Sequence, residues 1–455
     1  MNKKENKISK EIKINKKLAR RNYSNQTGIT LIALVVTIVV LLILAGVSLN
    51  AIFSENGIIK RAQDAQNKMN NAQESDLNAL NDLDKWINNQ VNGTTGGNTT
   101  GGNDNPSTTP KISTLVGKVV DKNTKAEDAY GNKITIPKGF KILEHNPTSN
   151  TGAVTYNYTN LEETGEHIPA VQDGIVIEDT QTGTAGNQFV WVPVGTIKNK
   201  NGSTNTITLG RYEFDSSTGA LKSTTPAQVA SVENCTKIVT ISKGGTDYQE
   251  LSTFREGNSA TNSTAQNATA RNLEEFISTT LANGGYYIAR FEASGTASKI
   301  ASKYNQTVLG NITQPNAAKV AREMYGEVKE NNELVYASDL VNSYAWDTAI
   351  VFIQTYSGKT DYASHNESIT TKAFTATGKN NDKYCNIWDM SGNAYEWTTE
   401  YSTSSYSSDF YPCVIRGGYY STDTGGAYNY TSARSYNGTT NSNSYYSLRS
   451  LLYVK

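Results

Sequence analysis

The chain is poor in the residues that most often hold metals or cross-link small proteins. It contains three cysteines, three histidines and nine prolines among 455 residues. Cys235, Cys385 and Cys413 are too few for a disulfide scaffold or a four-thiolate zinc site. The histidines are widely separated, and the chain has no glycine-rich phosphate loop, no GxSxG elbow and no HExxH motif. These absences exclude the enzyme classes that those motifs define.

Charge is balanced overall but divided along the chain. Lys and Arg together number 42, and so do Asp and Glu. A net charge of zero argues against a protein that coats nucleic acid, so we expect no nucleic-acid partner. Residues 1–28 nevertheless hold nine basic and two acidic residues. They form a basic leader, and the rest of the chain is correspondingly acidic.

A long apolar run follows this leader. Residues 29–49 carry no charge over 21 positions. As a helix they would extend about 32 Å, which matches a hydrocarbon core of about 30 Å. A cleaved secretory signal fits poorly, because the run exceeds a normal signal core and no A-x-A site follows it. The basic leader should stay in the cytoplasm, so we expect the membrane as a partner and an extracellular C-terminal head.

The junction between leader and apolar run carries a more specific motif. Gly28 and Ile29 open the sequence GITLI, which resembles the prepilin leader of type IV pilins and pseudopilins. That resemblance implies cleavage after Gly28, methylation of Ile29, other pilin subunits as partners, and a bacterial membrane, cell-surface or pilus location. Ala33 stands where the family has the Glu that pairs with a neighbouring subunit, which leaves filament incorporation open. A simple membrane anchor is the alternative.

Two segments connect this region to the remainder. Apolar residues recur every three or four positions from Ile58 to Ile87, which predicts that a pilin-like helix spans 29–89 with a kink near Gly57. An isolated stalk or coiled coil is the alternative. Residues 90–110 are mostly Gly, Asn, Thr and Pro, a composition that cannot bury enough surface to fold. We interpret them as a flexible linker.

The distal part is predicted to be an α+β head. Residues 111–186 contain short strand patterns separated by turn residues and form a small β-rich segment. Residues 187–455 contain further strands and three helices, predicted at 272–281, 315–325 and 344–354.

A series of short motifs runs through residues 187–455. They are FVWVP at 189–193, YIARFE at 287–292, AWDTA at 345–349, GNAYEWT at 392–398, RGG at 416–418 and a late Leu448-Arg449. In this order they resemble the formylglycine-generating enzyme (sulfatase-modifying factor) family. The resemblance implies a variant of the C-type lectin fold.

The same resemblance lets us compare the family's catalytic residues and its calcium ligands with this sequence. Oxidising members use a cysteine pair after the RGG motif, and no cysteine follows Gly418 here, so we expect no enzymatic activity. The family's structural calcium would be held by Asp389 and Glu396 side chains and by the carbonyls of Gly392 and Ala394. The alternative is that Glu396 pairs with Arg416 or Arg434 and that Trp388 and Trp397 are core residues.

The last part of the head is predicted to be a contact surface. Of the 29 residues at 419–447, 22 are Tyr, Ser, Thr or Asn, the types on which antibody paratopes depend. The candidate ligand-binding residues are Tyr419, Tyr420, Tyr428, Tyr430, Tyr436, Asn441, Tyr445 and Tyr446. The segment also resembles the variable region of proteins altered by diversity-generating retroelements. An ordinary Asn/Thr-rich loop is the alternative.

Together these features predict a non-enzymatic display or adhesion protein at the cell surface or on a pilus. Its ligand would be a protein or a glycan. The alternative is a minor pseudopilin or assembly component whose head is structural.

Leader processing is directly testable. Protein isolated from its native cells should begin at Ile29, because a prepilin peptidase would remove residues 1–28, and N-terminal sequencing checks this. The matched control is a Gly28→Leu variant, which should retain the leader. A wild-type chain that still begins at Met1 in cells with active prepilin peptidase would contradict the prediction.

Overall fold

The computed structural model describes residues 109–143, 170–235, 237, 239–250, 267–367, 374–406, 409–420 and 429–455. The chain divides into two units at residue 104, and the described residues all belong to the second, 105–455. The predicted leader, pilin-like helix and nearly all of the linker therefore lie outside the described residues. Within the described part, no helix combines the length and apolar character needed to cross a membrane.

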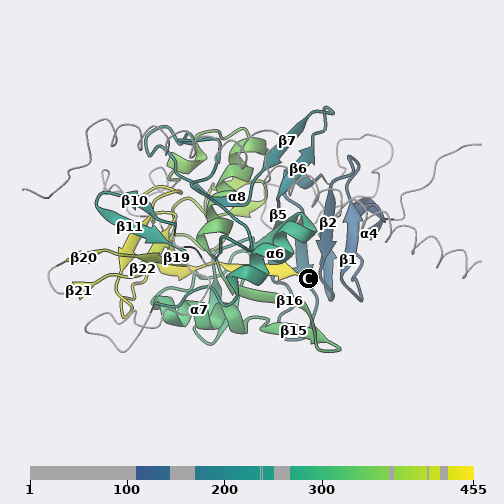
Figure 1. Cartoon of the computed structure of the whole chain (residues 1–455). Helices are drawn as coiled ribbons and strands as arrows, with labels where there is room; N and C mark the ends of the chain where they lie inside the picture. The colour runs from purple at the N-terminus through teal and green to yellow at the C-terminus, as the bar shows by residue number, and fades with distance from the viewer. Residues whose placement is uncertain are drawn as a thin grey trace, which may run out of the picture. The chain divides into compact units, whose positions relative to one another are not determined.

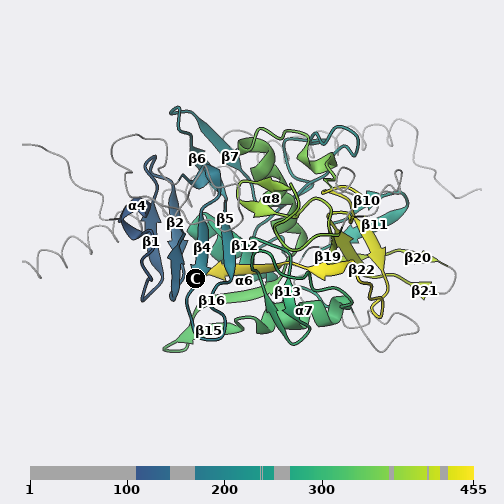
Figure 2. The ribbon, with the colours of Figure 1, turned by 180° about the vertical axis from the view of Figure 1, so that it is seen from behind.

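The larger sheet has seven antiparallel strands (Figures 1 and 2). In spatial order they are β15 (Glu327–Glu330), β16 (Glu333–Leu340), β25 (Ser450–Val454), β12 (Gly285–Ala289), β5 (Gln188–Pro193), β4 (Val176–Asp179) and β3 (Phe140–Ile142). The two motif strands β5 and β12 pair over five residues, and β25 covers the other edge of β12. The C-terminal strand is thus central to the sheet.

Apolar residues cover both faces of this sheet. Val190 and Ile288 pack into one core, while Trp191 and Tyr287, one residue along each strand, pack into a second. Successive side chains of a strand point to opposite faces, so a strand that is buried on both sides needs a continuous apolar run. This explains the FVWVP and LLYV sequences.

Helices cover one face of the sheet, and the N-terminal part of the head covers the other. The first core includes α6 (Leu273–Asn283) and α8 (Ser343–Tyr356). The second includes the hairpin of β1 (Thr124–Glu127) with β2 (Lys133–Ile136), and the short α4 (Ile112–Leu115).

Two strands that precede residue 187, β3 and β4, belong to the same sheet as strands of the following segment. The two segments predicted for the head divide between residues 186 and 187. β4 lies before this division and β5 after it, and the two strands are hydrogen-bonded.

The second sheet carries the late motifs. Its strands are β10 (Ile241–Lys243), β11 (Thr246–Gln249), β19 (Tyr395–Ser402), β22 (Cys413–Arg416), β23 (Ser435–Asn437) and β24 (Tyr446–Leu448). β19 lies at its centre, antiparallel to β11 and β22 and parallel to β24. The third core packs between this sheet and α7 (Gln314–Glu323).

The rest of the described chain forms short hairpins and turns. The two-stranded pairs are β6 (Gly195–Lys198) with β7 (Thr204–Ile207), β8 (Gly210–Arg211) with β9 (Gln228–Val229), β13 (Ser294–Thr296) with β14 (Lys299–Ala301), β17 (Lys383–Tyr384) with β18 (Ile387–Trp388), and β20 (Ser405–Tyr406) with β21 (Asp409–Phe410). Two 3₁₀ turns are η1 (Val171–Asp173) and η2 (Tyr362–Ser364).

The three predicted helices are confirmed to within one to two residues at most ends, and local capping explains why. The Asn272 side chain accepts a hydrogen bond from the Glu275 amide at the start of α6, and the helix ends at Gly284 in the left-handed conformation. Asn342 caps α8 in the same way. Pro315 lies in the first turn of α7, where its missing amide hydrogen costs nothing.

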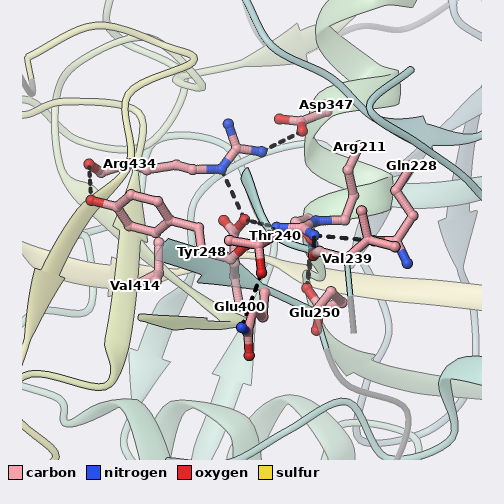
Figure 3. A network of polar contacts seen from close by, with 12 residues as sticks. Arg211, Gln228, Val239, Thr240, Tyr248, Glu250, Asp347, Glu400, Val414 and Arg434 are labelled. Carbon is pink, nitrogen blue, oxygen red and sulfur yellow. Dashed lines mark hydrogen bonds and ion pairs between the residues drawn. The ribbon is translucent and has the colours of Figure 1, made fainter. Parts of the chain in front are cut away.

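A fully buried ionic network connects the second sheet to α8 (Figure 3). One carboxylate oxygen of Glu400 on β19 accepts hydrogen bonds from Arg211 at 2.7 Å and from Arg434 at 2.8 Å, and the other accepts from Arg416 at 3.2 Å. Asp347 on α8 accepts from Arg416 and Arg434, both at 2.6 Å. Burial alone would raise the pKa of Glu400, but the three guanidinium groups outweigh it and lower the pKa to about 2.

Removing one carboxylate charge from this network should destabilise the head. A Glu400→Gln variant leaves three buried guanidinium groups against one carboxylate, and breaking a buried pair in this way typically costs about 3–5 kcal/mol. Chemical denaturation of the variant and the wild type measures the difference. Glu233→Gln is the control, because its exposed pair with Lys237 should contribute almost nothing. Equal stability of Glu400→Gln and wild type would contradict this account.

A second buried carboxyl next to the network gives a pH dependence. Glu250 accepts hydrogen bonds from the backbone amide and hydroxyl of Ser343 and from the Thr399 hydroxyl. Burial, and to a lesser extent the charge of Glu400, raise its pKa from 4.5 to about 7. The folded state therefore holds this proton more tightly than the unfolded state does, and its contribution is lost as pH rises through about 7.

This shift predicts that stability falls between pH 5 and pH 8. The loss attributable to Glu250 should be about 2.5 kcal/mol, from 1.36 kcal/mol per pKa unit over the part of the range between the unfolded and folded pKa values that lies above pH 5. Denaturation curves at both pH values should show a smaller loss for Glu250→Gln, which keeps the side-chain shape but does not titrate. An identical pH dependence in the variant and the wild type would rule out this assignment.

Candidate functional site

Five half-buried tyrosines form a continuous group of rings at one end of β19 and β24. Tyr395 begins β19 and lies opposite Tyr446 in the parallel ladder. Tyr445 directly precedes Tyr446, and Tyr419 and Tyr420 follow the end of β22. We call these five residues the tyrosine cluster.

Two glycines bring the chain back onto β19. Gly417 and Gly418 have φ values of 91° and 78°, a region that only glycine occupies readily. A Cβ at Gly417 would lie 2.9 Å from the Met390 carbonyl oxygen, so the close approach also requires glycine. After this turn, the Tyr420 amide donates to the Asn393 carbonyl at 3.0 Å and the Tyr419 amide to the Asn429 side chain at 3.1 Å.

The rings of the cluster stack closely. Tyr419 lies 4.9 Å from Tyr395, with ring planes 25° apart, and 4.6 Å from Tyr445, measured between ring centroids. Tyr445 and Tyr446 meet edge to face at 5.1 Å. The buried Trp397 packs against Tyr446, with the ring centroids 5.1 Å apart. Phe374, which is 39% exposed, packs against Tyr420 at a centroid distance of 5.4 Å.

The cluster offers rings and neutral hydroxyls. Burial and the neighbouring Tyr445 raise the pKa of Tyr446 to about 12, and burial also raises the pKa of Tyr395 and Tyr445. These phenols therefore stay protonated at physiological pH. Such a surface can stack on flat apolar groups and exchange hydrogen bonds with a polar ligand.

The structure brings together only part of the predicted contact surface. Tyr419, Tyr420, Tyr445 and Tyr446 lie in the cluster. Asn441 joins it indirectly, because its side chain donates to Asn437 at 3.0 Å and Asn437 hydrogen-bonds to Tyr446.

The other predicted tyrosines lie elsewhere. Tyr436 is on β23, which β22 and β19 separate from β24, and it packs against Tyr411 at 6.2 Å. Tyr430 is 9% exposed and lines a cavity. Tyr428 lies outside the described residues. Sequence reasoning missed Tyr395 and Phe374, and the signal for Tyr395 was its place inside the GNAYEWT motif.

The predicted calcium ligands lie in a buried acidic region. Glu396 uses both carboxylate oxygens to accept hydrogen bonds from Arg449, at 2.6 and 2.8 Å. The proposed alternative partners, Arg416 and Arg434, are therefore wrong: Arg449 on the neighbouring chain segment reaches Glu396 instead. Trp388 and Trp397 are core residues, as that alternative expected.

The remaining predicted ligands give mixed support for an ion. One oxygen of Asp389 accepts from the Gly378 amide at 2.6 Å, and the other has no hydrogen-bond partner in the structure. The Gly392 and Ala394 amides donate to the Gly417 carbonyl and to Glu292. Across the described part of the chain, no group of three or more His, Cys, Asp or Glu side chains is arranged to hold a metal. Calcium at Asp389, Gly392, Ala394 and Glu396 stays a prediction.

The three cysteines are separate, free thiols. Burial raises the pKa of Cys235, Cys385 and Cys413. A thiol with a raised pKa is a poor nucleophile and a poor metal ligand at neutral pH.

Comparisons with known proteins add little to this description. No protein-family model and no curated protein matches the chain. Among solved structures, the Major Tropism Determinant I1 variant matches at 13% sequence identity with a TM-score of 0.25, covering 76% of this chain and 99% of that one. A TM-score this low carries no argument about fold or function. The resemblances to prepilins and to the formylglycine-generating enzyme family therefore depend on the sequence motifs alone.

Proposed function

We propose that the described part of the chain is the recognition head of a non-enzymatic surface protein, and that the tyrosine cluster is its ligand-binding surface. The supporting observation is the continuous contact among five half-buried rings, which are stacked, tilted or edge to face. Stacked tyrosines lose little conformational entropy when they bind a partner, and they present a rigid amphipathic surface. Aromatic side chains of this kind dominate binding hot spots.

The cluster's exposure lies between the values expected for a core and for an open surface. A fully buried group of tyrosines would favour a structural head, as in a pilus assembly component. Here each ring keeps part of its area in solvent. The buried Trp397 packs against Tyr446, and the exposed part of the five residues would contact the ligand.

The proposal extends to how the head is presented. The uncharged run at 29–49 would anchor the protein in the membrane, alone or together with other pilin subunits, and the linker at 90–110 would let the head reach a ligand outside the cell. The chemistry of the described thiols supports a binding role, because raised pKa values disfavour thiolate-based oxidation.

A Tyr445→Ala variant tests the role of the cluster, because Tyr445 contacts Tyr419, Tyr420, Tyr395 and Tyr446. The full-length chain is first screened against a glycan array and a displayed-peptide library. For a hit, the variant should lose about tenfold or more in affinity, because hot-spot truncations cost at least 1–2 kcal/mol. Its melting temperature should change little.

Two controls sharpen this experiment. Tyr445→Phe keeps the ring and should retain most of the affinity. Tyr411→Ala removes a partly exposed tyrosine that packs against Tyr436, outside the cluster, and should leave binding unchanged. A sharp loss of melting temperature with unchanged affinity, or no binding to any probe, would assign the cluster to the core and favour the assembly-component alternative.

A further inference from the structure

A cavity of about 220 Å³ opens beside the second sheet, apart from the tyrosine cluster. Three chain segments form it: the turns that follow β8, the strand β10, and residues just before β23. Its lining residues are Glu213, Phe214, Asp215, Ser216, Lys222, Ile241, Ser242, Lys243, Tyr430, Ser432 and Arg434.

Each of the three segments contributes one cation to the cavity: Lys222, Lys243 and Arg434. Two carboxylates, Glu213 and Asp215, also line the cavity, so the lining holds three cations and two anions. Glu213 lies 4.0 Å from Lys222. Asp215 accepts hydrogen bonds from the amide and hydroxyl groups of two residues in its own turn.

Buried charged residues next to the cavity lining carry further positive charge. Arg434 belongs to the buried network, where three guanidinium groups face the two carboxylates Glu400 and Asp347. These charges affect the pKa of Lys243, which lines the cavity. Burial, followed by the charges of Arg434, Arg416 and Lys222, lowers the pKa of Lys243 to about 8. Burial is the larger cause of this shift; the smaller part, which comes from the surrounding cations, indicates a positive potential that favours an anion.

Size and lining chemistry narrow the class of ligand. The cavity could hold roughly seven water molecules at about 30 Å³ each, and it is smaller than the pockets of about 300–1,000 Å³ that bind drug-sized ligands. Three serines line it together with Tyr430 and two apolar side chains. The Lys243 ammonium donates a hydrogen bond to the Tyr430 hydroxyl and lies over its ring, 4.7 Å from the ring centroid. Serine hydroxyls beside this cation suit a ligand that has both hydroxyls and an anionic group.

We propose that this cavity binds an acidic monosaccharide, free or at the end of a glycan, with the ligand's carboxylate held by Lys243 and Lys222. The cavity and the tyrosine cluster are distinct, although they meet at consecutive residues. Asn429 contacts Tyr395 and Tyr419 of the cluster, whereas Tyr430 lines the cavity. The cavity site does not depend on the cluster being a binding surface.

The test titrates the full-length chain with sodium glucuronate, glucose and inorganic phosphate by isothermal calorimetry. Glucuronate should bind at least tenfold more tightly than either of the others, and its affinity should fall as salt is added. Binding of glucose as tight as that of glucuronate would overturn the role of charge. Binding of phosphate as tight would overturn the selection of a sugar. A glucuronate-terminated oligosaccharide, compared with free glucuronate, distinguishes the two sources.

Lysine variants locate the binding. Lys243→Gln should weaken glucuronate binding about tenfold or more. Lys237→Gln is the matched control, because Lys237 is an exposed lysine outside the cavity, and it should bind like wild type. If Lys243→Gln lowers the melting temperature, the Lys222→Gln variant is measured in its place. Lys222 is at a more exposed position, and its replacement should likewise weaken glucuronate binding.

Equal affinities in both cavity variants and the control would exclude the cavity. Tyr445→Ala should leave glucuronate affinity unchanged, so a failure of this proposal and a failure of the cluster's proposed role are distinguishable.

Discussion

The head depends on compensating charges that it has removed from water. Glu400 and Asp347 are fully buried, and each is tolerable only because guanidinium groups surround it. An isolated buried carboxylate would cost several kcal/mol, and so would an isolated buried arginine. The network therefore holds three strands (β8, β19 and β22), the helix α8 and the segment just before β23 in one arrangement, since moving any one of them leaves an uncompensated charge.

The same requirement positions the candidate functional residues. Arg416 lies three residues before Tyr419 of the cluster, and Arg449 lies three residues after Tyr446. Arg449 is itself held by Glu396, the neighbour of Tyr395. Short polar segments of this composition have little apolar surface with which to fix themselves. Buried arginines at their ends, Arg416 and Arg449, supply fixed points for these segments.

Two chemically different features result from this arrangement. The tyrosine cluster is neutral and aromatic, whereas the cavity beside β10 is lined by three cations and two carboxylates, and one of these cations, Arg434, belongs to the buried network. The buried network thus adjoins both features, through Arg416 before the cluster and through Arg434 in the cavity wall.

The sequence alone determined the elements whose signals are local. Helices α6 and α8 follow from their apolar spacing and Asn caps, and β5 and β12 follow from continuous apolar runs, because local sterics and burial on both faces fix these patterns. The tertiary structure decided which distant residues meet. It paired Glu396 with Arg449 and not with Arg416, separated Tyr436 and Tyr430 from Tyr446, and added Tyr395 to the cluster. Contacts between residues far apart in the chain, such as Glu396 with Arg449, depend on the order of the strands in the sheet, which composition and spacing do not encode. The tyrosine-rich segment therefore indicated a contact surface without specifying which rings would lie in it.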